Sequence, residues 1–244
     1  MTSYFAQISA LYRQARPTYP PPLFQWIAHK APARHLLWEP GCGSGQATLS
    51  LAQYFHKVIA TDPSPEQLRE APPHPHIAYR CEPAERPSLH PQSADAIAVA
   101  QAYHWFDQEA FWQAVAQVAK PGALIAVWGY GDCFSPNPHL QAFLQEAHTQ
   151  VDPYWPPERH HIQTAYQELP FPLPKLPTPT WPMEAVWPVE RILAYIYTWS
   201  ALRRWKEGEG WFQAFAQEVL GTFGEGTALP LAWPFFLRAG YWEG

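Results

Sequence analysis

The sequence predicts an α/β protein with a doubly wound, mostly parallel seven-stranded sheet, helices at the N-terminus and a helical cap in the C-terminal half. Short apolar runs alternate with helix-like segments between residues 35 and 130, which is typical of a parallel sheet covered by helices on both faces. A glycine cluster follows the first apolar run, and an acidic residue ends the second, where open α/β sheets bind their ligands.

The first half of the chain supplies five strands and the helices between them. Helices are expected over residues 4–14 and 23–30, separated by a proline-rich connection. A helix that starts at Ser64-Pro65 has the residue types of an N-cap and a first helical position. Continuous apolar runs favour strands buried on both faces. Strands are expected over residues 35–38, 57–61, 76–79, 95–100 and 123–128, with further helices over 46–55 and 106–119.

The second half of the chain loses this alternation after residue 130. Residues 170–188 contain seven prolines, so no regular central strand is expected there. The same segment carries Trp181 and Trp187, which disordered linkers rarely contain. We therefore expect a packed, irregular segment with one edge strand near residues 171–187. Helices are expected over residues 140–151, 190–206 and 211–220, and a last strand over 229–237.

Composition and charge exclude several functional classes. Of the 244 residues, 47% are hydrophobic, enough for a sizeable core, and no apolar run approaches the ~20 residues of a membrane span. The formal net charge of −5 gives no electrostatic reason to expect nucleic acid. The three cysteines are scattered, which indicates neither a disulfide framework nor a metal site. Without a secretory signal, a cytoplasmic location is expected.

The strongest candidate site is the segment Glu39-Pro40-Gly41-Cys42-Gly43-Ser44-Gly45, between the first strand and the next helix. Glycines at alternate positions let the backbone turn sharply and approach a ligand without Cβ atoms in the way. The spacing is Gly-x-Gly-x-Gly, not the Gly-x-Gly-x-x-Gly of a dinucleotide site, and the lysine of a phosphate loop is absent. Asp62 ends the second strand, where a carboxylate accepts hydrogen bonds from ribose hydroxyls.

At these residues the sequence resembles the class I S-adenosylmethionine-dependent methyltransferases. The likeness extends to residues 12–20, 62–68, 83–87, 101–107, 120–122 and 197–201, a set similar to the methyltransferase type 11 subgroup that includes the trans-aconitate methyltransferases. The resemblance implies a Rossmann-like fold in a single domain over residues 1–244. Its parts would be an N-terminal helical lid (1–34), a cofactor-binding core (35–130), a substrate cap (131–226) and a final strand (227–244).

The resemblance also implies roles at the cofactor site. S-adenosyl-L-methionine would be the cofactor and S-adenosyl-L-homocysteine its product, with no metal. Glu39 would meet the amino group of the methionine part, Asp62 the ribose, and Ala84 and Glu85 the adenine edge. Pro40 departs from the usual loop pattern. The expected cofactor-binding residues are Tyr12, Arg16, Glu39, Gly41, Gly43, Gly45, Asp62, Pro63, Gln67, Ala84, Glu85 and Gln101.

Methyl transfer needs a nucleophile that is held close to the methyl carbon and in line with it, with water excluded. An amine or phenol acceptor needs a general base, and His104, just past the fourth strand, is the catalytic candidate. The alternative for His104 is a structural residue that hydrogen-bonds the loop backbone. A carboxylate acceptor needs no base but does need a cationic clamp. The candidates for this clamp are Arg13, Arg16, Arg203 and Arg204.

The aromatic second half of the chain, with eight of the 13 tryptophans after residue 130, indicates where the acceptor binds. We expect residues 131–215 to cap the cofactor's methyl group, with Tyr130, Trp199, Arg203 and Trp205 lining the substrate pocket. The expected function is methyl transfer to a small molecule, with a carboxylate as one candidate, and without nucleic-acid or membrane partners. The alternatives are a cofactor-binding protein without catalysis and a dinucleotide-dependent oxidoreductase, which the glycine spacing disfavours.

Overall fold

The computed structural model describes residues 15–244, so the helix expected over residues 4–14 lies outside the described residues. The chain divides into two compact units. The sheet unit comprises Tyr19–Gly131, His160–Trp181 and Phe235–Gly244, and the helical unit comprises residues 15–18 with Asp132–Arg159 and Pro182–Pro234. Each unit is therefore assembled from segments far apart in the sequence. Within residues 15–244, none of the helices has both the length and the apolar character needed to cross a membrane.

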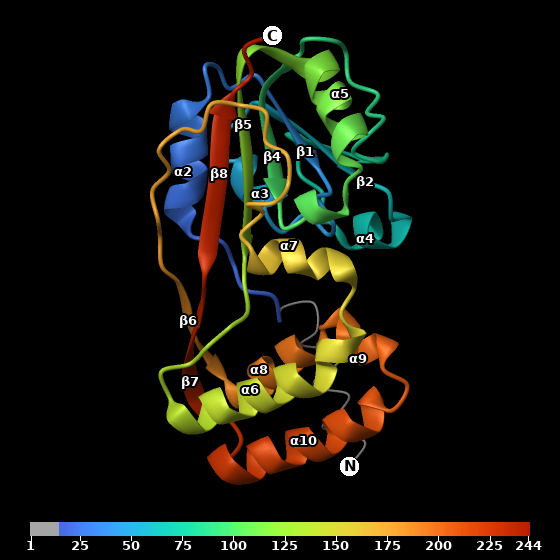
Figure 1. Ribbon diagram of the computed structural model, residues 1–244. Coiled ribbons are helices and arrows are strands. Elements are labelled where there is room, and N and C mark those ends of the chain that lie inside the picture. The colour runs from blue at the N-terminus through green and yellow to red at the C-terminus, as the bar shows by residue number, and fades with distance from the viewer. Residues whose placement is uncertain (1–14) are drawn as a thin grey trace. The chain divides into compact units, whose positions relative to one another are not determined.

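The sheet unit contains six strands in the order β3-β2-β1-β4-β5-β8 (Figure 1). The first five strands pair in parallel, and β8 pairs antiparallel with β5. The expected mostly parallel α/β sheet is confirmed, with six strands in place of the expected seven. The strands are β1 Leu36–Pro40, β2 Lys57–Asp62, β3 Ile77–Cys81, β4 Ala94–Ala100, β5 Ala119–Tyr130 and β8 Phe235–Tyr241.

Prolines explain why the sheet ends at β8. The proline-rich segment runs beside this strand, where the Leu176 N–H donates to the Ala239 carbonyl at 2.8 Å and the Thr178 hydroxyl donates to the Leu237 carbonyl at 3.2 Å. Because proline has no N–H group, this segment cannot extend the contact into a ladder of hydrogen bonds. The next segment forms β6 Met183–Pro188, which pairs antiparallel with β7 Ala228–Trp233 in a separate two-stranded sheet.

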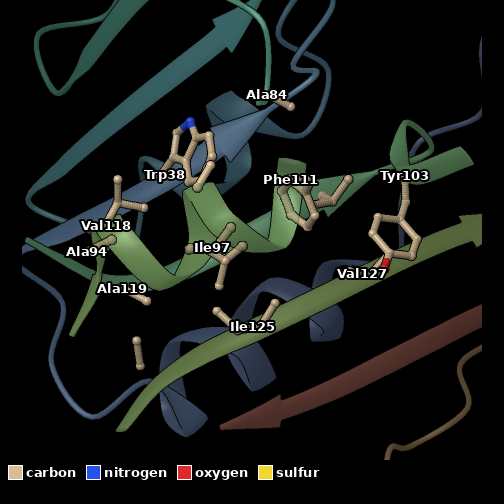
Figure 2. Packing of buried hydrophobic residues seen from close by; sticks show 14 of the residues in the cluster. Trp38, Ala84, Ala94, Ile97, Tyr103, Phe111, Val118, Ala119, Ile125 and Val127 are labelled. Carbon is tan, nitrogen blue, oxygen red and sulfur yellow. The ribbon is translucent and has the colours of Figure 1, made fainter. Parts of the chain in front are cut away.

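Two helices cover the two faces of the main sheet (Figure 1). On one face, α2 Pro21–Lys30 places Phe24 edge-on against Trp128 of β5, with ring centroids 6.4 Å apart. On the other face, α5 Gln108–Val118 places Phe111 in a buried cluster with Ile97 and Ile125 (Figure 2). Alternate residues of the central strands therefore enter two apolar layers, and the polar residues of the site lie where the strands end.

Short helices connect the strands of the sheet unit. The Ser64 hydroxyl accepts a hydrogen bond from the Gln67 N–H at 3.2 Å, which confirms the expected N-cap of α4 Pro65–Glu70. The helix expected over residues 46–55 is shorter, because α3 Thr48–Leu51 tightens into a turn in which the Tyr54 N–H donates to the Leu51 carbonyl at 3.0 Å. A further short helix, α7 His160–Gln163, begins the segment that returns to the sheet unit.

In the helical unit, one expected helix and one expected strand are each divided into two elements. The helix expected over residues 190–206 divides at Thr198, whose hydroxyl donates to the Tyr195 carbonyl at 2.7 Å and ends the first helix. The strand expected over residues 229–237 divides at Pro234, so β7 and β8 belong to different units. The main helices of this unit are α6 Pro138–Val151, α8 Val189–Tyr197, α9 Ser200–Arg204 and α10 Gly208–Phe223.

Candidate cofactor site

The glycine loop joins β1 to α3 at the carboxyl end of the sheet. Gly41, Gly43 and Gly45 all have positive φ angles, of +68°, +54° and +82°. A Cβ atom on Gly41 would lie 2.5 Å from the Cβ of Ala102, and one on Gly45 would lie 2.7 Å from the Tyr79 hydroxyl. Both the backbone conformation and the available space therefore require glycine at these two positions. The loop presents main chain, without side chains, to whatever binds there.

Glu39 is the last acidic residue before the loop, and it is completely buried at 0% exposure. Neither of its carboxylate oxygens has a hydrogen-bond partner among the described residues. Burial raises the pKa of Glu39 to about 8, partly offset by the nearby Thr48 hydroxyl and reinforced by the charge of Asp62. A buried carboxyl group without a partner is costly, so this position suits a ligand that brings a cation or a hydrogen-bond donor.

Asp62 ends β2 and is 8% exposed. Its two carboxylate oxygens accept hydrogen bonds from the Gly43 N–H at 2.8 Å and from the Ser64 N–H at 2.9 Å. The acid therefore ties the glycine loop to the start of α4, and each oxygen keeps a further lone pair for a ligand. Pro63 and Gln67 are exposed beside it, and the Gln67 side-chain oxygen lies 3.7 Å from the position of a Cβ atom on Gly43.

Two further predicted residues are held by backbone contacts. The Gln101 side chain donates to the Tyr130 carbonyl at 3.0 Å and accepts from the Tyr130 N–H at 2.8 Å, which joins the ends of β4 and β5. Gln101 also has a φ of +54°, a conformation that is strained for a residue other than glycine and that often marks functional sites. Ala84 is buried, and the Glu85 carboxylate accepts from the Asp107 N–H at 3.0 Å.

His104 follows β4 in the short helix η2 Tyr103–Trp105 and is 6% exposed. Its Nδ1 atom lies 2.9 Å from the hydroxyl of Tyr166. Burial, and then the nearby His161, lowers the pKa of His104 to about 4. The imidazole is therefore neutral at physiological pH and is a weak base, because an efficient general base has a pKa near the working pH.

The helical unit brings two of the predicted arginines together. The Arg16 guanidinium donates to the Thr198 carbonyl at 3.4 Å, and the Arg203 guanidinium donates to the same oxygen at 3.3 Å. The two guanidinium groups therefore lie close together at one backbone oxygen. Tyr12 and Arg13 lie outside the described residues.

The predicted pocket residues fall in both units. Trp199 stacks on His148, with ring centroids 4.3 Å apart, and Trp205 stacks on Tyr154, with centroids 5.3 Å apart. These two tryptophans and Arg203 belong to the helical unit. Tyr130 belongs to the sheet unit, where it is buried at the end of β5 with its ring 6.0 Å from that of Tyr19.

Three site residues were missing from the sequence prediction. The hydroxyls of Thr48 and Tyr79 are buried without hydrogen-bond partners among the described residues, as is the carboxylate of Glu39. Burial, followed by the charge of Glu39, raises the pKa of Tyr79 to about 12. Tyr166, the partner of His104, is the third. Thr48 lies in α3, Tyr79 in β3 and Tyr166 in the turn after α7, so no local motif could have joined all three to the glycine loop.

Comparisons with known proteins identify the family. Residues 38–127 match the model of a methyltransferase domain. A solved structure of a protein assigned as a type II methyltransferase from Anaeromyxobacter dehalogenans is 40% identical, with a TM-score of 0.83 over 93% of this chain and 97% of that chain. The chain belongs to the class I S-adenosylmethionine-dependent methyltransferases. This removes the oxidoreductase alternative, whereas the trans-aconitate subgroup remains a prediction.

Other proteins are similar to this methyltransferase over part of their length. A Dictyostelium discoideum protein assigned as a methyltransferase is 37% identical over 68% of this chain and 64% of its own. A Saccharomyces cerevisiae protein assigned as S-adenosylmethionine-dependent is 33% identical over 50% of this chain and 45% of its own. The chain therefore spans about half to two thirds of these curated relatives. YcgJ of Bacillus subtilis, at 16% identity and a TM-score of 0.53, shares the fold.

The methyltransferase site has the chemistry that its cofactor needs. S-adenosylmethionine carries an ammonium group, which suits the buried, unpartnered carboxyl of Glu39. Its ribose hydroxyls suit the remaining lone pairs of Asp62, and the glycine loop leaves room for the ligand. Among residues 15–244, no cluster of three or more histidine, cysteine, aspartate or glutamate side chains could hold a metal ion.

Proposed function

We propose that this methyltransferase methylates a carboxylate oxygen of a small molecule. The observation that carries the proposal is the convergence of Arg16 and Arg203 on the Thr198 carbonyl in the helical unit. Guanidinium groups bind carboxylates through paired, charge-assisted hydrogen bonds. These two guanidinium groups would thus recognise the carboxylate, with Trp199 and Trp205 of the same unit contributing apolar surface.

The state of His104 supports the same class of acceptor. A carboxylate has no proton to lose, so its methylation requires no general base. The lowered pKa of His104, about 4, makes the imidazole unsuited to deprotonate an amine or a phenol. When bound, the cofactor would supply an activated methyl group on a sulfonium, with the thioether sulfur as the leaving group. The products are a neutral ester and a thioether, and no proton is transferred.

The cofactor-binding roles are part of this proposal. Glu39 would bind the ammonium group, Asp62 the ribose, and the backbone of Gly41, Gly43 and Gly45 the methionine part. Pro63, Gln67, Ala84, Glu85 and Gln101 would complete the site. The net charge of −5 supports a small-molecule acceptor and not nucleic acid, and we propose a cytoplasmic location.

The experiment is a turnover assay with methyl-labelled S-adenosylmethionine. Small mono-, di- and tricarboxylates are each compared with the matching primary amide, and S-adenosylhomocysteine and the methyl ester are measured by mass spectrometry. We expect product with a carboxylate and none with its amide. In Arg203→Gln, the loss of a charge-assisted contact is expected to raise the acceptor KM by about 10- to 100-fold. Lys206→Gln, which removes an exposed cation from the same unit, is the control.

Two outcomes would contradict the proposal. Tight cofactor binding without S-adenosylhomocysteine from any metabolite pool would favour the alternative of a cofactor-binding protein without catalysis. Methylation of amines or phenols, with carboxylates inert, would show that the acceptor class is wrong.

A further inference from the structure

The sheet unit contains a buried pair formed by His104 and Tyr166. His104 lies in η2, directly after β4, and Tyr166 lies three residues beyond the end of α7. The Nδ1 atom of His104 and the Tyr166 hydroxyl are 2.9 Å apart, and Tyr166 is 0% exposed. The two rings are tilted by 32° to each other, with centroids 5.7 Å apart.

Tyr166 is held in place by an unusual backbone. Ala165 and Tyr166 have φ angles of +50° and +60°, which cost energy in residues other than glycine and persist only when the surroundings fix them. The Arg238 guanidinium supplies that constraint, because it donates to the carbonyl of Tyr166 and, at 3.0 Å, to that of Leu169. The ring also packs edge-on against Phe236, 4.9 Å away. The hydroxyl is therefore aimed at His104 by fixed structure.

The surroundings of the phenol determine which atom donates. A buried O–H group requires an acceptor. Among residues 15–244, the acceptor found within hydrogen-bond distance of the Tyr166 hydroxyl is Nδ1 of His104. Nδ1 therefore accepts, and in a neutral imidazole the proton then lies on Nε2.

Both members of the pair are neutral near neutral pH. Burial lowers the pKa of His104 to about 4, and burial raises the pKa of Tyr166 above its ordinary value. The titratable and charged groups that face the pair are His161 from α7, Tyr103 from η2, Tyr130 from β5 and Arg238 from β8. Because neither partner titrates between pH 6 and 9, the tautomer of His104 defines its chemistry over that range.

We propose that Tyr166 is a positioning residue that holds His104 as the Nε2–H tautomer, so that His104 donates a hydrogen bond to an oxygen of the methyl acceptor. The proposal rests on the carboxylate acceptor proposed above, since an N–H donor suits an oxyanion and not the lone pair of an amine. His104 lies near the glycine loop in sequence and in space, because Ala102, two residues before it, packs against Gly41.

The first test measures the tautomer on the cofactor-free protein by two-bond ¹H–¹⁵N NMR with labelled histidine. His104→Gln identifies the His104 signals. In the unaltered protein we expect a protonated Nε2 and an unprotonated Nδ1. Tyr166→Phe removes the donor and should produce a mixture of tautomers. Tyr241→Phe, which removes a hydroxyl bonded to the Lys30 carbonyl at 3.1 Å in the same unit, should leave the spectrum unchanged.

The second test uses the accepted carboxylate substrate. His104→Gln keeps an N–H donor without a base, so kcat should stay within about tenfold and the pH profile should stay flat from pH 6 to 9. His104→Leu has no N–H donor to orient the acceptor, so kcat should fall by about 100-fold with the cofactor Kd unchanged. Tyr166→Phe should lower kcat by about tenfold without a matching change in KM. The substitution leaves the tautomer of His104 unfixed but does not remove a contact to the acceptor.

Three results would overturn the proposal: an Nδ1–H tautomer in the unaltered protein, an unchanged tautomer in Tyr166→Phe, or a complete loss of turnover in His104→Gln with cofactor binding intact. Failure of the carboxylate proposal gives a different pattern. In that case no methyl ester forms in any variant, whereas the tautomer of His104 is still read directly from the spectrum.

Discussion

The carboxyl end of the parallel sheet and the helical unit differ in the kind of side chain that they bury. Around the glycine loop, polar groups are buried without partners, as for Glu39 and Tyr79, and the backbone adopts conformations that only glycine accepts easily. In the helical unit, rings stack on rings, as in the pairs Trp199–His148 and Trp205–Tyr154. The first region therefore suits a polar ligand, whereas aromatic packing stabilises the second. We therefore expect single-atom substitutions around the glycine loop to weaken cofactor binding strongly. Substitutions among the stacked rings should change the acceptor KM only modestly.

The largest effect is expected from Gly41→Ala. The new Cβ atom would meet Ala102 at 2.5 Å in a backbone with φ of +68°. The left-handed strain of about 1–2 kcal/mol and an overpacking cost of about 1–3 kcal/mol should together weaken cofactor binding by about 100-fold. Calorimetric titration with S-adenosylhomocysteine measures this loss.

Gly122→Ala is the matched control for that variant. Gly122 has a φ of +80°, but no atom of a non-adjacent residue within 15–244 lies within 4 Å of the position that its Cβ would occupy. It should lose some thermal stability and keep its cofactor Kd. If both variants bind equally well, the close approach at Gly41 has no role in binding.

The second effect is expected from Asp62→Asn. The amide keeps one acceptor, but its NH₂ group then faces either the Gly43 N–H or the Ser64 N–H, which now lie 2.8 and 2.9 Å from the carboxylate. Loss of one charge-assisted hydrogen bond, about 1.5–3 kcal/mol, predicts a cofactor Kd that is higher by about 10- to 100-fold. Asp132→Asn breaks the ion pair with Arg159 in the helical unit and should leave that Kd within about twofold. Equal losses in both variants would contradict the division between the two regions.

The third effect is a proton released on binding. With a pKa of about 8, Glu39 is mostly protonated in the cofactor-free protein at pH 7, and an ammonium group beside it should drive it to ionise. Titrations in buffers of different ionisation enthalpy should show about one proton released, and none in Glu39→Gln. Equal proton release by both proteins would exclude Glu39 as the ammonium ligand.

The same carboxyl predicts how stability depends on pH. Its pKa is raised from 4.5 when unfolded to about 8 when folded, so the folded state holds more protons between these values. The cofactor-free protein should therefore lose stability as pH rises from about 5 to 8, relative to Glu39→Gln. Melting temperatures of the two proteins across this range measure the difference.

The sequence was sufficient for features that depend on neighbouring residues. The glycine spacing, Asp62 at a strand end and the Ser64 N-cap are local patterns, and each was found where expected. The helix break at Thr198 was missed, because residues 190–206 keep a helical pattern and the break appears only in the hydrogen bond to the Tyr195 carbonyl. The pairing of His104 with Tyr166 joins residues 62 positions apart, which no periodicity encodes.

The smallest effect is expected in the helical unit, from Trp205→Phe. Trp205 is half-buried, and its ring stacks on Tyr154 with centroids 5.3 Å apart and lies tilted by 38° against Trp211, 5.6 Å away. Phenylalanine keeps an aromatic face with less area, so the change in stacking is about 0.5–1.5 kcal/mol. We expect the acceptor KM to change by a few-fold, about 2- to 10-fold, while the cofactor Kd stays the same. Measuring both constants on one preparation decides the matter, because a change in cofactor Kd without a change in KM would show that Trp205 does not contact the acceptor.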